Sequence, residues 1–122
     1  MRVALVTVQG DVHDIGKTIV GAMMTASGYE VYDLGTDIKN EDVIEKVREI
    51  KPDVLGLSAL LTSTMEEQGK IIEMLKDEGI RDNVKVIIGG APVNQAWADK
   101  ITADGYSDNA IAAVKLVETL IA

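Results

Sequence analysis

Short runs of β-branched and aliphatic residues alternate along this chain with longer segments whose apolar residues recur at helical spacing. Strands are predicted over residues 2–8, 30–34, 53–58 and 84–89, with a weaker one at 105–106. Three of these runs are almost continuously apolar, as expected for parallel strands that are covered on both faces. Helices are predicted around residues 15–24, 43–50, 71–75, 93–100 and 111–121. The alternation therefore predicts an α/β fold.

Strands and helices that alternate in this way form a doubly wound parallel sheet with right-handed crossovers and helices on both faces. For five strands in 122 residues, the expected strand order is 2-1-3-4-5, the order of flavodoxin-like (Rossmann-type) domains. The length is that of a single domain. Ligands of such sheets bind outside the carboxyl ends of the strands, so the loops at 9–17, 58–64 and 89–94 form the candidate site.

The composition excludes several classes of function. The net charge of −8 argues against nucleic acid or an anionic membrane as a partner, because both require clustered Lys and Arg. The chain has no cysteine, so it has no disulfide, no thiolate zinc site and no thiol nucleophile. No apolar run approaches the ~20 residues of a membrane span, and no signal peptide is recognisable. We therefore expect a cytoplasmic protein.

The first of the three loops contains His13, the only histidine of the chain. Asp11 lies two residues before it, near enough to accept the Nδ1 proton and leave the Nε2 lone pair for a metal. Ser58, at the end of the adjoining third strand, is predicted to donate to the Asp11 carboxylate. One histidine cannot form a structural zinc site, which needs four protein ligands. Any metal at His13 must therefore arrive with most of its coordination already filled.

Three other functions associated with similar loops do not fit this sequence. Between Gly10 and Gly16 there is one residue more than a phosphate loop allows, and Asp11 and Asp14 would place carboxylates against the phosphate. Phosphoacceptor domains of bacterial signalling need an aspartate at the end of the third strand, where this chain has Ser58. A hydrolytic triad would need a G-x-S-x-G turn, which does not surround Ser58.

Small residues occupy the ends of the third and fourth strands, namely Gly56, Ser58, Gly89, Gly90 and Ala91. Their missing side-chain volume predicts a channel between the sheet and the helices that could admit something long and flat. The alternative is that Gly89 and Gly90 form an ordinary turn before a helix that begins at Pro92.

The three loops together resemble a known signature. Asp11-x-His13-x-x-Gly16, then Ser58-x-Leu60 with Thr62, then Gly89-Gly90, is similar to the motif of the cobalamin-binding domain of methionine synthase and its relatives. The segments TVQGDVHDIGKTIV, LSALLTSTM and IIGGAPVNQAWADKI are similar to corrinoid proteins of methylamine, methanol and related methyltransferase systems. The resemblance covers residues 1–122 and indicates a cobalamin-binding domain without the helical domain that usually precedes it.

The resemblance implies a role for each matching residue. His13 would be the axial cobalt ligand, with Asp11 and Ser58 behind it, while the dimethylbenzimidazole of the cofactor leaves the cobalt and is buried in the domain. Gly10, Val12 and Asp14 would lie beneath the corrin ring, and Thr62, Gly89, Gly90 and Ala110 along the buried nucleotide tail. The complete set of expected cofactor-binding residues is Gly10, Asp11, Val12, His13, Asp14, Ile15, Gly16, Ser58, Leu60, Thr62, Gly89, Gly90 and Ala110.

The function implied by the resemblance is that of a methyl carrier. Its cobalt would alternate between Co(I) and methyl-Co(III), loaded and unloaded by separate methyltransferases and served by a reductive activator, so that the domain itself is a non-catalytic component. Two alternatives stay open. One is the cobalamin subunit of an adenosylcobalamin-dependent mutase, whose motifs overlap strongly. The other is a non-enzymatic cobalamin-binding module.

Overall fold

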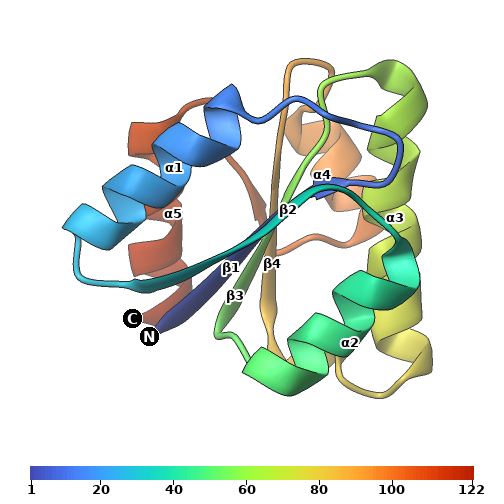
Figure 1. The fold of residues 1–122 in the computed structure, drawn as a ribbon, viewed down its shortest axis with the longest axis horizontal. Helices are drawn as coiled ribbons and strands as arrows, with labels where there is room; N and C mark the ends of the chain where they lie inside the picture. Colours follow the sequence, from blue (N-terminus) through green and yellow to red (C-terminus); the bar gives the residue numbers. More distant parts are fainter.

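The computed structural model describes residues 1–122 and contains one five-stranded parallel sheet with helices on both faces (Figure 1). The strands are β1 (Arg2–Val8), β2 (Glu30–Ile38), β3 (Val54–Ser58), β4 (Lys85–Gly89) and β5 (Gly105–Tyr106). Their order in the sheet is β2-β1-β3-β4-β5, and every neighbouring pair is parallel. The predicted fold class and strand order are confirmed.

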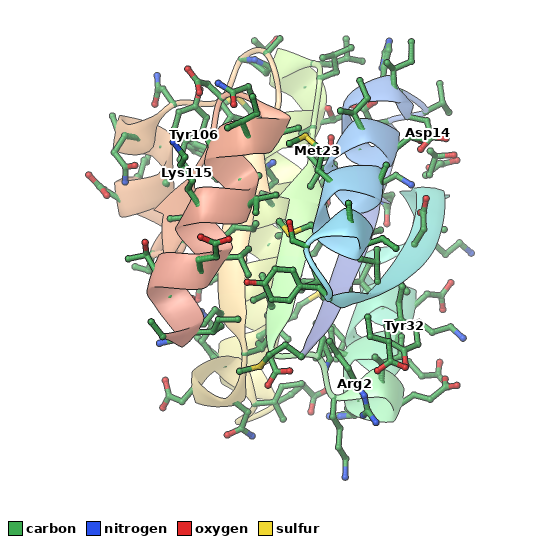
Figure 2. All side chains as sticks on the ribbon, turned by 90° about the vertical axis from the view of Figure 1, so that its left-hand side faces the viewer. Arg2, Asp14, Met23, Tyr32, Tyr106 and Lys115 are labelled. Atoms are coloured by element: carbon green, nitrogen blue, oxygen red, sulfur yellow. The ribbon has the colours of Figure 1, made fainter.

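The helices divide into two unequal layers. One face is covered by α1 (Ile15–Ala26) and α5 (Ala110–Ile121), which lie side by side with Met23 between them (Figure 2). The other face carries α2 (Asn40–Ile50), α3 (Thr62–Asp77) and α4 (Gln95–Ile101), with a short 3₁₀ turn at Arg81–Asn83. The buried apolar cluster on the side of α2, α3 and α4 has 17 residues, whereas the one beneath α1 and α5 has 8. The thinner packing under α1 and α5 leaves room for a cavity on that side.

Three predicted boundaries were wrong. β2 continues to Ile38 instead of ending at 34, with register irregularities opposite Val6. α3 begins at Thr62, inside the segment predicted to be a loop. α4 begins only at Gln95, where the Asn94 side chain accepts from the Trp97 N–H at 2.8 Å, so Pro92 does not start the helix. Each error lies at the carboxyl edge of the sheet, where residues of the candidate site interrupt the apolar periodicity of the strands and helices.

The three candidate loops meet at this edge. The Ala59 N–H donates to the Gly89 carbonyl oxygen at 3.1 Å, which joins the loop after β3 to the loop after β4. The loop after β1 packs beside them, because the Asp11 carboxylate accepts from the Leu60 N–H at 2.7 Å. None of the helices has the length and apolar character needed to cross a membrane.

Candidate functional site

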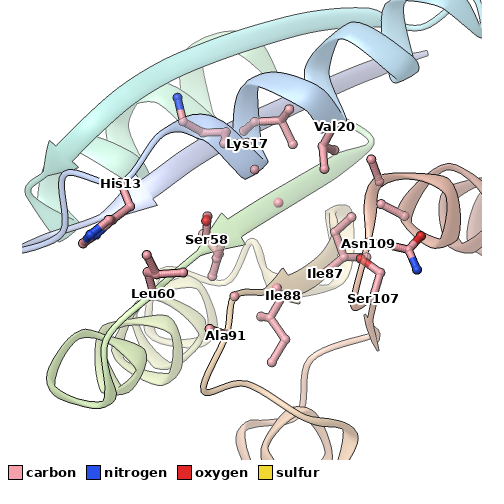
Figure 3. A pocket seen from close by; sticks show the side chains of 18 of the residues that line it. His13, Lys17, Val20, Ser58, Leu60, Ile87, Ile88, Ala91, Ser107 and Asn109 are labelled. Carbon is pink, nitrogen blue, oxygen red and sulfur yellow. The ribbon is translucent and has the colours of Figure 1, made fainter.

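His13 is fixed by a contact with Asp11, as its spacing predicted. Its Nδ1 lies 2.8 Å from Asp11 Oδ1. A carboxylate can only accept, so Nδ1 carries a proton, and in the neutral imidazole Nε2 is the nitrogen that has the lone pair. Nε2 has no hydrogen-bond partner in the protein, and the imidazole is 48% exposed at one end of a slot (Figure 3). The side chain is held in one tautomer and is free to bind a metal.

Asp11 is a fully buried carboxylate that is surrounded by donors. Its Oδ1 accepts from the His13 N–H at 3.0 Å and from the imidazole, and its Oδ2 accepts from Leu60 N–H and Thr64 Oγ1, both at 2.7 Å. Burial, the largest single influence, raises the pKa of this carboxyl, but the hydrogen bonds from Thr64, Leu60 and His13 together hold the pKa well below its ordinary value. Asp11 is therefore ionised.

The predicted hydrogen bond from Ser58 to Asp11 is not formed, and Thr64 takes that place. Both Asp11 oxygens already have their donors, and the Ser58 hydroxyl makes no hydrogen bond in the protein. Because α3 begins at Thr62, its first turn carries Thr64 back toward the loop after β1. Ser58 instead lines the slot. The chain of contacts behind the imidazole is therefore His13, Asp11 and Thr64.

The backbone of the His13 loop is fixed on both sides. The Thr7 hydroxyl donates to the His13 carbonyl oxygen at 3.0 Å. Asp37 holds the loop from β2, since its N–H donates to the Asp11 carbonyl and its Oδ1 accepts from the Gly10 N–H, both at 2.8 Å. Asp37 has a positive φ of 51°, a conformation that aspartate tolerates better than most residues. The unpredicted extension of β2 thus serves to position the loop.

Lys17 was missed in the sequence and lies almost completely buried beside the site. Its ammonium group pairs with Asp33 of β2 and with Asp14 Oδ1, the latter at 2.9 Å. Burial, the largest single influence, raises the pKa of Asp33, but hydrogen bonds from Lys17 and the Gly35 N–H together hold the pKa below its ordinary value. The Asp14 carboxylate turns to Lys17 and does not cap α1. This cluster ties the start of α1 to β2.

A slot of about 740 Å³ extends from His13 between α1, α5 and the ends of β3 and β4 (Figure 3). Ten of the residues expected to bind the cofactor line it: Val12, His13, Asp14, Ile15, Gly16, Ser58, Leu60, Gly89, Gly90 and Ala110. Asp11 stands behind His13. Gly10 and Thr62 do not line the slot, because Gly10 is turned to Asp37 and Thr62 is exposed at the start of α3. Lining residues that sequence reasoning missed are Leu5, Lys17, Val20, Leu57, Ile87, Ile88, Tyr106, Ser107, Asp108, Asn109 and Ala113.

Apolar side chains around His13 are unusually exposed. Val12 is 69% and Ile15 81% exposed, and Leu60 is 40% exposed on the other side of the imidazole. Contiguous exposed apolar surface that is rimmed by polar residues is typical of ligand-binding and interaction sites. Nowhere do three or more His, Asp or Glu side chains cluster closely enough to hold a metal ion. A metal bound at His13 would need other ligands from outside the protein.

Fold and site together define a class of protein. This is an α/β domain that offers one imidazole nitrogen within an apolar surface, beside a deep slot at the carboxyl edge of its sheet. Such a site suits a flat ligand that carries its own metal. The chain belongs to the family of B12-binding domains, since the family model described as "B12 binding domain" matches residues 1–115.

Individual relatives and solved structures agree with this assignment. The chain is 54% identical over 116 residues to dimethylamine corrinoid protein 1 of Methanosarcina acetivorans, covering 95% of this chain and 54% of the relative. A cobalamin-binding protein from Desulfitobacterium hafniense superposes with a TM-score of 0.95 at 42% identity, over 99% of this chain and 59% of that one. A methanol:cobalamin methyltransferase complex from Methanosarcina barkeri gives a TM-score of 0.91 at 38% identity, over 98% and 46%. The chain spans about half the length of these relatives.

Replacing Thr64 by valine tests the contact chain. The variant removes one donor from the Asp11 carboxylate, and we expect the free energy of unfolding at pH 7 to fall by about 1–3 kcal/mol. The low pKa of folded Asp11 stabilises the fold above the ordinary carboxyl pKa of about 3.9, and this contribution is lost as pH falls toward the folded pKa. The deficit of the variant should therefore shrink in acid. Urea unfolding at pH 7 and pH 3 measures it.

Two matched variants control this experiment. Thr64→Ser keeps the hydroxyl and should keep most of the stability. Ser58→Ala removes a hydroxyl that makes no hydrogen bond in the protein and should change the free energy of unfolding by no more than about 0.5 kcal/mol. A larger loss in Ser58→Ala than in Thr64→Val would restore Ser58 as the partner of Asp11.

Proposed function

We propose that this domain binds a corrinoid and carries the methyl group of a corrinoid-dependent methyltransferase system. The observation that carries the proposal is the free Nε2 of His13 at the end of the slot, held by Asp11 and Thr64. The names of the relatives, which are corrinoid proteins and a cobalamin methyltransferase complex, support the same function.

The residues of the site fit a corrinoid. A corrin would bring four nitrogen ligands of its own to its cobalt, so His13 would be a sufficient protein ligand. The exposed Val12, Ile15 and Leu60 provide an apolar bed for the ring. The slot beside them would hold the nucleotide tail of the corrinoid. When bound, the corrinoid cobalt supplies the methyl-transfer chemistry, and the protein supplies position and electrostatics.

The protein groups control the imidazole. Asp11 keeps the proton on Nδ1, so that Nε2 presents its lone pair. Thr64 and the Leu60 N–H keep the Asp11 carboxylate ionised and oriented. The three groups thus tune how strongly the imidazole donates.

The proposed partners are separate methyltransferases that load and unload the methyl group, with a reductive activator that restores the active cofactor. We expect the complex to work in the cytoplasm. A dimethylamine corrinoid protein and a methanol:cobalamin methyltransferase complex are among the similar proteins, and their names favour a methyltransferase system over a mutase subunit or a non-enzymatic cobalamin-binding module.

Reconstitution tests the proposal. Purified protein mixed with cobalamin should retain the cofactor through gel filtration and show the visible spectrum of a corrinoid whose own base has left the cobalt. It should then accept and release a methyl group with a partner methyltransferase. A protein that retains no cobalamin, or that retains it without methyl turnover, would contradict the binding or the carrier part of the proposal respectively.

Asp11→Asn is the variant that separates holding the cofactor from tuning it. The amide keeps the size of the side chain but removes the negative charge beside Nδ1, and loss of such a partner commonly changes a metal site by ~10–100-fold. We expect cobalamin to bind while the cobalt(II)/cobalt(I) potential, measured by spectroelectrochemistry, shifts. Asp14→Asn is the control, since Asp14 contacts Lys17 and makes no hydrogen bond to the imidazole. An equal shift in both variants would contradict the role of Asp11.

A further inference from the structure

The slot has an apolar floor that is set by the register of the sheet. Leu5, Gly56 and Ile87 are direct partners across β1, β3 and β4. A Cβ on Gly56 would lie 2.6 Å from Leu5 Cδ2 and 3.7 Å from Ile87 Cγ1. The Leu5 and Ile87 side chains therefore cover the glycine and form the floor. Val20 of α1 and Ala113 of α5 close it from the helix side. All five groups are hydrocarbon or glycine.

No polar group on the floor is free. At Gly56, β3 is paired with β1 on one side and with β4 on the other, so its backbone N–H and C=O groups are used in the sheet. Leu5, Ile87 and Ala113 are at most 4% exposed. In the same row of the sheet the nearest charged groups are Asp33 and its partner Lys17, and Leu5 stands between them and Gly56. A polar atom placed on this floor would find no hydrogen-bond partner.

One row nearer the mouth, the lining becomes polar. Two residues further along each strand, on the same face, the partners are Thr7, Ser58 and Gly89. The Thr7 hydroxyl is used by the His13 carbonyl, which leaves the Ser58 hydroxyl without a protein partner. Ser107 and Asn109 follow at the opening, beside the start of α5 (Figure 3). The slot thus suits a ligand with a hydrocarbon end and a hydrogen-bonding middle.

We propose that this floor selects the corrinoid by its lower base, preferring a benzimidazole, whose outer edge is hydrocarbon, over a purine. The inference rests on the proposed function, in which the nucleotide tail enters the slot. An adenine base would bury an amine and ring nitrogens that water satisfies outside the slot, and each buried group without a partner carries a penalty. The sugar and phosphate of the tail are common to both corrinoids and meet the polar level in each case.

The test compares three ligands on the apoprotein: cobalamin, its adenine analogue, and cobinamide, which lacks the nucleotide. Dissociation constants come from visible absorbance, with the emission of Trp97, the only tryptophan, as a second readout. We expect the adenine analogue to bind on the order of tenfold to a hundredfold more weakly than cobalamin. Equal affinities for the two nucleotides would overturn the proposal while leaving corrinoid binding intact. Cobinamide binding as tightly as cobalamin would overturn it too, whereas no binding of any of the three would refute the proposed function.

A substitution on the floor provides a matched pair of variants. Ala113→Ser adds a hydroxyl to the floor on α5, and we expect it to narrow the preference for cobalamin by roughly threefold to tenfold, the effect of one new hydrogen bond. Ala112→Ser makes the same change one residue earlier, at a position that does not line the slot. It should leave unchanged the ratio of the dissociation constants for the adenine analogue and for cobalamin. An identical ratio in wild type and both variants would show that the floor does not set the preference. The wild-type ratio stands as a test even if Ala113→Ser does not fold.

Discussion

Replacement of His13 by alanine is expected to remove the axial nitrogen from bound cobalt(II) while leaving the fold intact. The imidazole is 48% exposed on a loop, and Asp11 keeps its hydrogen bonds from Leu60 and Thr64 without it. We therefore expect the free energy of unfolding to change by less than about 1 kcal/mol. Electron paramagnetic resonance of the cobalt(II) form should lose the splitting due to one nitrogen. Affinity for cobalamin should fall by more than the ~10–100-fold that is lost when a hydrogen-bond partner of a metal ligand is removed.

Added imidazole distinguishes loss of the ligand from damage to the site. The space vacated by His13 opens into the slot, so free imidazole should enter it and restore the nitrogen splitting. Restoration should depend on Asp11, because the carboxylate orients the imidazole through Nδ1. The variant His13→Ala combined with Asp11→Asn should therefore respond weakly or not at all. Nitrogen splitting that survives in His13→Ala without added imidazole would show that another group binds the cobalt.

The fold could be predicted because its pattern is repeated. Each β–α unit presents the same switch from an apolar run to a helical stripe, and one topology accommodates five such units. β2 was cut short because Gly35 and Asp37 interrupt the apolar pattern, yet the chain stays extended through them. Those residues are placed for the site, since Asp37 holds the loop that carries Asp11. The apolar pattern therefore failed to predict the end of β2, where the strand also holds the loop after β1.

The site was predictable in its local contacts and not in its distant ones. The pairing of Asp11 with His13 follows from a spacing of two residues in a loop. The third member could not be read in the same way, because Thr64 reaches Asp11 across 53 positions and only through the turn of α3. The nearest strand end suggested Ser58, which shares a row with Thr7 but faces the slot. Predicting the contact of Thr64 with Asp11 would have required knowing that α3 begins at Thr62.

Lys17 shows a different limit. A lysine on the first turn of a helix is usually solvated, and nothing in the sequence pattern indicates that its side chain is 2% exposed between two carboxylates. The contact depends on β2 lying at the edge of the sheet beside β1, which brings Asp33 under the start of α1. Residues that join two elements through the sheet become visible only once the topology is known.

The close approach of two loops predicts the largest loss of stability. Gly90 has a φ of 129°, a region that is essentially closed to other residues, and a Cβ there would overlap the carbonyl oxygen of Ala59. The carbonyl oxygen and carbon of Ala59 belong to the backbone, and they cannot move aside as the end of a side chain can. We expect Gly90→Ala to lower the free energy of unfolding by at least about 4 kcal/mol. Against a total of about 5–15 kcal/mol for a domain, much of the fold would be lost.

Two other glycines separate the causes of this effect. Gly79 also has a positive φ, of 71°, but nothing lies within 4 Å of the place a Cβ would take, so Gly79→Ala measures strain alone, about 1 kcal/mol. In Gly89→Ala the new Cβ would lie 3.3 Å from the Ser107 carbonyl, a tight contact without a positive φ. In urea unfolding followed by circular dichroism, Gly90→Ala should have a much lower free energy of unfolding than Gly79→Ala or Gly89→Ala. If it ranks with Gly79→Ala, the two loops do not meet as described, and the slot between them has another shape.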